Sequence, residues 1–392
     1  MPANIEEIYQ LFESKETGSS EKLKKLLKEA EYKYQVGIHE FVHKPGNSIL
    51  EFADWRVFRA VFKLQMLTSM TKHVDSKFKH PHLRELLKFP VLFLGATPEK
   101  TPAMYSLMNY ADLVLGTWYP LGGMHKIIEG MVSVAEELGV KFLYHQNVNE
   151  IQIKNKKANL VVTDKTQFNA DIVVGGADYH HIEQQLLPKA ARQYSKKYWD
   201  SRILAPSSLI FYVGVNKKIK HLEHHNLFFD ADFAQHAYEV YERPNWPSKP
   251  LFYVCCPSKT DDTVAPEGME NLFFLMPVAP GLEDNISIRD KYFKIMVDRL
   301  EKQTGTSIRE NIVVKKAFAH QDFKERYNAF KGNAYGLANT LKQTAILKPK
   351  LKSKKVKNLY YAGQLTVPGP GVPPCIISGE VVAKEIIKDK IV

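Results

Sequence analysis

The sequence predicts a two-domain fold that combines α/β and α+β architecture, and three observations lead to this class. The first 115 residues carry apolar residues mainly at helical spacing. Stretches at 207–215, 251–256 and 271–277 have strand patterns with turn residues between them, which is typical of an antiparallel sheet. Near the C-terminus, a short apolar run at 358–362 is followed by a rigid loop and a helical pattern, the order expected of an α/β unit.

Composition and charge restrict the class of protein. The chain has 392 residues, of which 44% are hydrophobic and 25% charged, as in ordinary globular proteins. The net charge of +11 is spread along the chain apart from a lysine cluster at 350–357, and no nucleic-acid-binding module accompanies it. No apolar run reaches the roughly 18 residues of a membrane-spanning helix. The basic surface is therefore either simply solvated or attached to an anionic membrane face.

The cysteines predict neither a disulfide framework nor a metal site. Cys255 and Cys256 lie in an apolar run that predicts a buried strand, and Cys375 stands alone. A reduced, cytoplasmic setting is therefore the default expectation. The N-terminal residues are acidic and lack the apolar segment of a signal peptide.

Three histidines close together in the sequence raise the question of a metal ion. His221, His224 and His225 lie among lysines in a polar segment, and no carboxylate-rich motif accompanies them. We therefore expect a surface loop here and no bound metal.

The N-terminal part of the chain predicts helices. Residues 1–45 carry two apolar stripes, and Ser20 is expected to cap the second helix. Another amphipathic helix is predicted at 124–138, with Gly139 directly after it. We expect the apolar residues of this helix to face inward: Ile127, Ile128, Met131, Val132, Val134 and Ala135.

Short strands are expected to follow. The patterns at 141–145 and 148–153 predict strands, and a turn at 155–157 leads to another strand at 159–163. The apolar run at 171–174 predicts a buried strand. Later elements are a helix at 290–304 and a strand at 312–318.

The loop after the C-terminal strand has the composition of a ligand-binding loop. From 368 to 374 every residue except Val372 is glycine or proline, and such a run continues neither a helix nor a sheet. The helical pattern resumes after Pro374. Backbone N–H groups in this loop and the positive end of the helix dipole favour a flat or anionic ligand. A corner without a ligand is the alternative, but one left-handed turn needs only one glycine.

The stretch Tyr361-Ala362-Gly363-Gln364-Leu365-Thr366-Val367-Pro368-Gly369-Pro370-Gly371-Val372-Pro373 resembles the C-terminal flavin signature of the bacterial carotenoid desaturases, the phytoene desaturase family. The resemblance implies that FAD lies against this loop. The cofactor-binding residues that it implies here are Gly363, Gln364, Pro370, Gly371, Val372, Cys375 and Ile376. Backbone N–H groups around the last four are the candidate donors to the flavin, since Pro373 and Pro374 have no N–H.

Other segments resemble further parts of the same family in the same order: 116–124, 147–151, 171–178 and 323–336. Within the second of these, Val148 matches the position whose backbone meets the adenine end of FAD. The family begins with a strand, a Gly-x-Gly-x-x-Gly turn and a helix, and no such motif occurs in this sequence. We therefore expect a fragment that lacks the pyrophosphate-binding unit.

With this resemblance, the predicted fold is a two-domain fold of the FAD-dependent amine-oxidase or desaturase type. It combines an incomplete Rossmann-type FAD domain with an inserted substrate domain of antiparallel sheet and helices. We assign 1–115 to a helical, membrane-associated part of the substrate domain, and 181–345 to its main part. The FAD domain is assigned 116–180 and 346–392.

The resemblance also implies the chemistry, which is FAD-dependent desaturation of phytoene or a related carotene by hydride transfer to the flavin. A charged pair near the flavin corresponds to Asp54 and Arg56, which become the candidate catalytic residues. Arg59 is an alternative to Arg56, and a surface charge set on a helix is an alternative to both.

Two other functions stay open at this point. One is a later-step carotenoid dehydrogenase or a retinol saturase-like oxidoreductase. The other is a non-catalytic remnant that has lost FAD binding. The expected partners are a carotene or isoprenoid hydrocarbon, the inner face of the cell membrane as a peripheral attachment site, and quinone or oxygen as electron acceptor. Nucleic acid is not among them.

Overall fold

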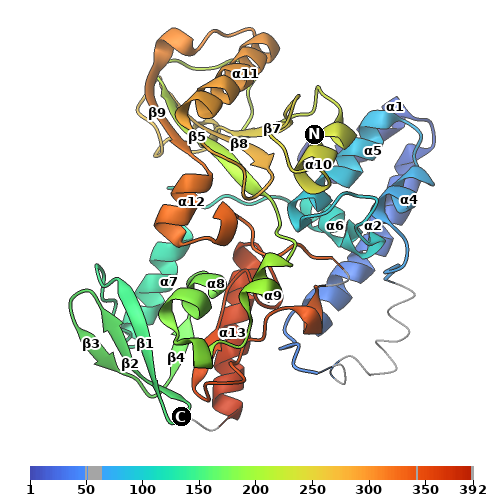
Figure 1. The fold of residues 1–392 in the computed structure, drawn as a ribbon. Coiled ribbons are helices and arrows are strands. Elements are labelled where there is room, and N and C mark those ends of the chain that lie inside the picture. Colours follow the sequence, from blue (N-terminus) through green and yellow to red (C-terminus); the bar gives the residue numbers. More distant parts are fainter. Residues whose placement is uncertain (49–50, 52–63, 341–342, 390–392) are drawn as a thin grey trace. The chain divides into compact units, whose positions relative to one another are not determined.

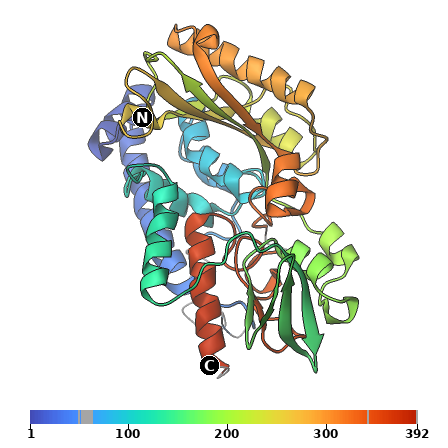
Figure 2. The same cartoon turned by 90° about the vertical axis from the view of Figure 1, so that its left-hand side faces the viewer.

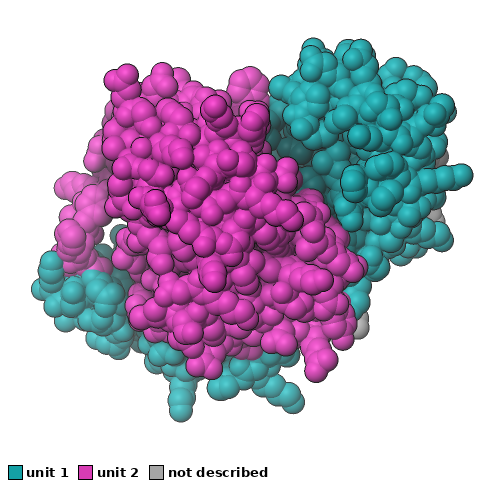
Figure 3. Space-filling model, turned by 90° about the horizontal axis from the view of Figure 1, so that it is seen from above, with its two compact units in different colours: residues 1–117, 147–206, 335–392 teal, residues 118–146, 207–334 magenta. Residues whose placement is uncertain are grey.

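The computed structural model describes residues 1–48, 51, 64–340 and 343–389. The chain forms two compact units, and each is assembled from separate parts of the sequence (Figure 3). The first unit contains 1–117, 147–206 and 335–392, and the second contains 118–146 and 207–334.

A helical subdomain begins the first unit (Figure 1). Its helices are α1 (Ile5–Lys15), α2 (Ser19–Val36), α4 (Met70–Asp75), α5 (Pro81–Lys88) and α6 (Leu107–Leu113). The apolar stripes read from the sequence meet in one core that includes Phe12, Leu26 and Phe78, all fully buried. The expected cap was wrong, because α2 begins at Ser19 and its N-cap is Gly18 in the left-handed conformation (φ 78°).

The rest of the first unit carries two small sheets. Strands β1 (Val148–Lys154), β2 (Lys157–Thr163) and β3 (Gln167–Asn169) form an antiparallel sheet in that order. Strand β4 (Val173–Gly175) pairs in parallel with β10 (Leu359–Tyr361). The expectation that these distant strands belong to one unit is confirmed. Short helices α8 (Tyr179–His181) and α9 (Lys196–Asp200) follow β4 along the chain.

Helix α13 (Val372–Lys388) follows the C-terminal loop and packs on β10 (Figure 2). Its buried residues Val381 and Val382 share a small core with Tyr360 and Leu351. This shared core fixes α13 relative to β10, and so it fixes the two ends of the loop that joins them.

The second unit is built on an antiparallel sheet in the strand order β6-β7-β8-β5-β9. Its strands are β5 (Ser207–Val215), β6 (His225–Phe228), β7 (Phe252–Cys255), β8 (Glu270–Val278) and β9 (Ile312–Phe318). Helix α11 (Ile286–Thr304) covers one face, and its Tyr292, Met296 and Leu300 share a core with Phe211 and Phe274 (Figure 1). The other helices are α7 (His125–Glu137), α10 (Phe233–Tyr241) and α12 (His320–Tyr327).

Two sequence-based expectations were wrong in the second unit. Residues 141–145 form no strand, because no partner strand lies beside them in the described chain and an isolated strand is not stable. Helix α7 forms as predicted, but none of its residues is buried. Ile128, Met131 and Val134 are 49%, 47% and 56% exposed, because nothing in the described structure covers this apolar face.

The chain passes between the two units at 117/118, 146/147, 206/207 and 334/335. The domain assignment made from the sequence remains a prediction, both in its boundaries at 115/116, 180/181 and 345/346 and in the roles of its four segments. Among the residues that the structure describes, no helix is long and apolar enough to cross a membrane.

Candidate cofactor site

The candidate site is the loop between β10 and α13, at 362–371. Its backbone relies on Gly369, where φ is 137° and an added Cβ would lie 3.1 Å from the Asn339 side-chain oxygen and 3.3 Å from Lys348 Nζ. Only glycine combines this conformation with so close an approach to polar atoms. Gly371 also has a positive φ, of 112°, and acts as the N-cap of α13 without a side-chain bond. The glycine and proline run therefore presents backbone rather than side chains.

Two hydroxyl groups hold the start of the loop. The buried Ser378 hydroxyl oxygen accepts a hydrogen bond from the Gly363 N–H at 2.7 Å. The Thr366 hydroxyl donates to the Gly363 carbonyl oxygen at 2.8 Å. Because Ser378 lies on the second turn of α13, the helix itself fixes where the loop leaves β10.

The first turn of α13 offers fewer donors than a normal helix. Pro373 and Pro374 have no N–H, and the Cys375 N–H donates to the Gly371 carbonyl oxygen at 3.0 Å. A contact between Cys375 and a cofactor would therefore come from its half-buried thiol rather than its N–H. Val372 and Ile376 are exposed beside this turn, so an apolar surface borders the helix N-terminus.

Behind the loop lies a buried polar group of side chains that the sequence analysis missed. Lys348 is 2% exposed, and burial lowers the pKa of its ammonium group to about 7. Lys348 Nζ, Asn339 Oδ1 and Thr340 Oγ1 are buried and have no hydrogen-bond partner among the described residues. Unpaired buried polar atoms are costly, and they commonly mark a place where a ligand or an ordered water binds.

The only sequence signal for this cluster was weak. Lys348 stands between Leu347 and Pro349, just before the lysine cluster that suggested a solvated surface. Asn339 lies in a segment without periodicity, so nothing in the sequence placed it behind Gly369.

The cofactor-binding role of the predicted residues remains a prediction. Gly363 and Gln364 lie at the start of the loop, and Pro370, Gly371, Val372, Cys375 and Ile376 lie at its end and in the first turn of α13. Val148 begins β1, opposite Thr163 of β2, and so belongs to the antiparallel sheet of the same unit. Asp54 and Arg56 lie outside the described residues, and their catalytic role remains a prediction.

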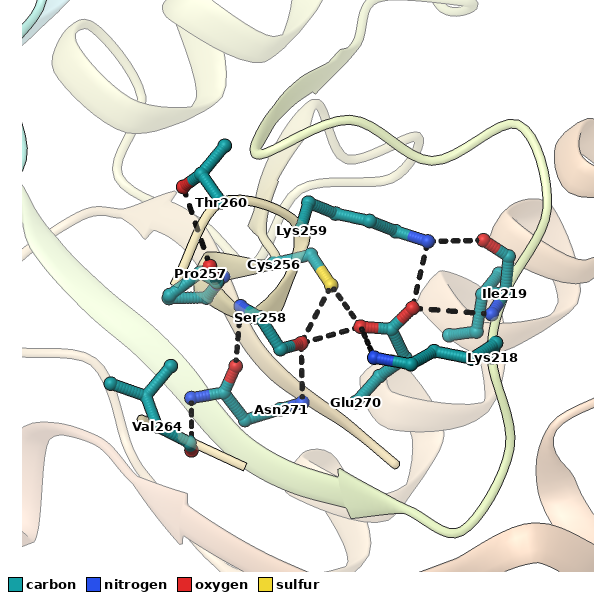
Figure 4. Close-up of polar contacts among 10 residues, drawn as sticks. All are labelled: Lys218, Ile219, Cys256, Pro257, Ser258, Lys259, Thr260, Val264, Glu270 and Asn271. Carbon is teal, nitrogen blue, oxygen red and sulfur yellow. Dashed lines mark hydrogen bonds and ion pairs between the residues drawn. The ribbon is translucent and has the colours of Figure 1, made fainter. Parts of the chain in front are cut away.

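A second buried polar cluster lies at the start of β8 in the second unit (Figure 4). The buried Glu270 carboxylate binds Lys259 Nζ at 2.7 Å and accepts a hydrogen bond from the Ser258 hydroxyl at 2.5 Å. The Cys256 thiol points to the same carboxylate, and burial raises its pKa to about 12. Cys256 is thus a structural thiol, in agreement with the predicted buried strand.

Comparison with known proteins identifies the family. The model for flavin containing amine oxidoreductases matches residues 54–387. The carotenoid 3,4-desaturase of Haloarcula japonica is 42% identical over 388 residues, which cover 98% of this chain and 78% of that protein. The phytoene desaturase of Fusarium fujikuroi is 31% identical over 395 residues, which cover 93% of this chain and 68% of that protein.

Solved structures support the fold. An oxidoreductase from Methanosarcina mazei matches with a TM-score of 0.55 at 17% identity, over 81% of this chain and 68% of that one. A putrescine oxidase redesigned in its cofactor binding matches with a TM-score of 0.53 at 12% identity, over 94% of this chain and 75% of that one. The family match also makes a flavin the cofactor. The chain therefore belongs to the flavin containing amine oxidoreductases and, within them, to the carotenoid desaturases.

Proposed function

We propose that the chain is the greater part of an FAD-dependent desaturase that acts on phytoene or a related carotene. The observation that carries the proposal is the glycine and proline loop at 362–371. Behind it lie polar atoms of Lys348 and Asn339 that have no partner among the described residues. A flavin has a flat ring with polar edges and fits these features, because the loop offers backbone and the buried atoms lack partners. The names of the two curated relatives supply the substrate class.

The residues of this chain would bind and orient the cofactor rather than carry out acid–base chemistry. When bound, the flavin supplies the acceptor for the hydride that leaves the carotene. The N–H of Val372 at the start of α13 and the positive end of the α13 dipole favour negative charge beside the loop. Lys348 adds a cationic group behind Gly369 whenever it is protonated. The exposed apolar side chains of Val372 and Ile376 suit a hydrocarbon or a ring face and would exclude water.

Firm binding of FAD would need a pyrophosphate-binding unit that this sequence does not contain. The chain covers 78% and 68% of the lengths of the two relatives. Two observations support a further segment. The parallel pair β4–β10 is far smaller than an ordinary parallel sheet. The apolar face of α7 is bare and would suit a covering element.

The substrate class also suggests where the protein works. A carotene is held in lipid, so we infer peripheral attachment to the inner face of the cell membrane, aided by the net charge of +11. The final electron acceptor would be quinone or oxygen.

A later-step carotenoid dehydrogenase is the second candidate, and the 42% identity to a carotenoid 3,4-desaturase favours it. The two are separated by the carotene that is consumed.

The test is product analysis in a host that makes carotenes. The chain is expressed alone and fused behind the N-terminal segment of the Haloarcula japonica relative, in cells that accumulate phytoene and in cells that accumulate lycopene. We expect the fusion to carry bound FAD and to convert one of these carotenes to a more unsaturated product. A fusion that binds FAD but changes neither carotene would refute the substrate class. A fusion that folds without binding flavin would show that the chain is a non-catalytic remnant.

A further inference from the structure

Two adjacent histidines face a cysteine across a strand pair of the second unit. Strands β6 and β7 are antiparallel, and His225 stands directly opposite Cys255. His224 immediately precedes β6, and its carbonyl oxygen accepts a hydrogen bond from the Cys256 N–H at 2.8 Å. One ligand atom from each of His224, His225 and Cys255 lies within 4.8 Å of the other two. The backbone pairing of two strands therefore fixes three metal-binding side chains in one place.

The alternation of β7 separates the two neighbouring cysteines. Phe252 and Val254 point into the core, whereas Tyr253 and Cys255 lie on the opposite face and are only partly buried. The Cys256 thiol points to Glu270 instead (Figure 4). Cys255 is therefore the cysteine that an ion from solvent would reach.

Hydroxyl groups orient both histidine rings. His224 Nδ1 lies 2.6 Å from the Thr260 hydroxyl oxygen, and His225 Nδ1 lies 2.5 Å from the Tyr253 hydroxyl oxygen. When the ring N–H of His224 donates to Thr260, the lone pair of the imidazole is on Nε2. Metal-binding histidines typically hold their second nitrogen by such a bond.

The His224 Nε2 atom gives the independent sign of a ligand. It is buried and has no hydrogen-bond partner in the part of the chain that the structure describes. Leaving such an atom unpaired is unfavourable, and a cation would satisfy it. The ring of Tyr119 packs edge-on against His224 at 4.7 Å between centroids and shields this side of the site.

We propose that His224, His225 and Cys255 form a binding site for zinc. Two imidazoles and one thiolate are a ligand set that suits this borderline-soft ion. Zinc–nitrogen and zinc–sulfur bonds of about 2.0–2.3 Å bring ligand atoms to roughly 3.5 Å from one another, so small side-chain rotations close the site. Binding releases the thiol proton of Cys255 to solvent, and no electron is transferred. The fourth position is left to water.

The site does not depend on the desaturase chemistry, since that chemistry requires no metal. Its structural effect would be to join β6 to β7 and to fix the segment that carries Tyr119. The segment that the sequence predicted as a surface loop would then contain an ordered metal site at His224 and His225.

The test titrates the purified full chain with zinc, and with cobalt as a spectroscopic substitute. We expect one equivalent of zinc to bind and to raise the temperature of thermal unfolding, and cobalt to show a thiolate-to-metal absorption band. Cys255→Ser should abolish this band, and His224→Ala and His225→Ala should each weaken zinc binding at least about tenfold. His221→Asn and Cys375→Ser are the matched controls, and neither should change the affinity for zinc.

Thermal unfolding of each variant in the presence of a chelator separates loss of the site from loss of the fold. Under these conditions every variant should unfold at about the same temperature as the parent protein. Zinc binding that persists at full strength in Cys255→Ser would overturn the proposal. So would a cobalt spectrum without a thiolate band, or several weak equivalents that the histidine substitutions leave unchanged, because these indicate adventitious surface binding only.

Discussion

The side chain of Asn358 pairs with the backbone of Ala158 as a neighbouring strand residue would. Its Oδ1 accepts a hydrogen bond from the Ala158 N–H at 2.8 Å, and its Nδ2 donates to the Ala158 carbonyl oxygen at 2.7 Å. The same Nδ2 donates to the Asp171 carbonyl oxygen at 2.7 Å. One buried amide therefore joins β2, the entry to β4 and the start of β10.

Replacing this amide should destabilise the first unit. Asn358→Ala leaves buried backbone groups of Ala158 and Asp171 without partners, so we expect a loss of about 2–4 kcal/mol in the free energy of unfolding. Chemical denaturation measures it, and Asn169→Ala on the exposed side of β3 is the control. Equal stability of the two variants would show that Asn358 does not join these strands.

The second prediction concerns the start of the loop. Ser378→Ala removes the acceptor of the Gly363 N–H, and we expect a destabilisation of about 1–2 kcal/mol together with weaker flavin binding by the fused protein. Flavin fluorescence on dilution measures the second effect. The exposed Ser287 provides the matched serine-to-alanine control. Unchanged flavin affinity in Ser378→Ala would argue against a loop that must be held from α13.

Replacing Lys348 should raise the stability of the protein without flavin but weaken its binding of flavin. Lys348→Met removes a buried amine that has no partner within the described part of the chain, so the protein without flavin should become more stable. The same change should weaken flavin binding in the fused protein, because the cationic group behind Gly369 is lost. If the variant is less stable without flavin, the amine has a structural partner and the proposed role fails.

The pH dependence of that stability gain follows from the lowered pKa. The unfolded chain holds a proton on Lys348 up to its ordinary pKa of 10.5, whereas burial lowers the folded value to about 7. Between these values the unfolded state binds more protons, so the wild-type protein gains stability as the pH rises. The advantage of Lys348→Met should therefore be largest below pH 7 and should shrink towards pH 10.5. Thermal unfolding of both proteins across this range tests it.

Glu270 should contribute stability with the opposite pH sign. Burial would raise the pKa of this carboxyl group, but hydrogen bonds from Lys259, Ser258 and Cys256 outweigh burial and hold the pKa below its usual range. The contribution is present above the ordinary pKa of a glutamate and is lost as the pH falls through the lowered value. Glu270→Gln should cost about 1–3 kcal/mol at neutral pH and less in acid, with the exposed Glu267→Gln as control. A cost that is independent of pH would show that the charge is not involved.

The sequence predicted those elements whose apolar pattern finds a partner in the fold. Strands β5 and β9 begin and end where the pattern placed them, because they pair with each other along most of their length. The stretch at 141–145 has an equally good pattern but no partner among the described strands, and it stays irregular. Helix α7 shows the same limit, since periodicity predicts a helix but not what covers it.

The candidate sites also contain parts that the sequence predicts and parts that only the folded chain brings together. The loop at 362–371 was predictable because glycine and proline act locally on the backbone. Lys348 behind Gly369 was not, since only the folded chain brings these residues together. His224 and His225 were visible as a pair, but their cysteine comes from another strand, and β6 itself was missed.

The bond between Asn358 and Ala158 joins residues 200 positions apart in the sequence. Strand β4 likewise has to wait for β10, which is synthesised much later than β4 itself. Closing so long a loop is slow, and the cofactor loop is shaped only once it is closed. A nascent chain therefore carries its N-terminal helices and its second sheet well before it has a place for the flavin, and cofactor capture becomes a late step. Cells short of flavin would then accumulate a nearly finished chain, with apolar surfaces exposed to chaperones and proteases.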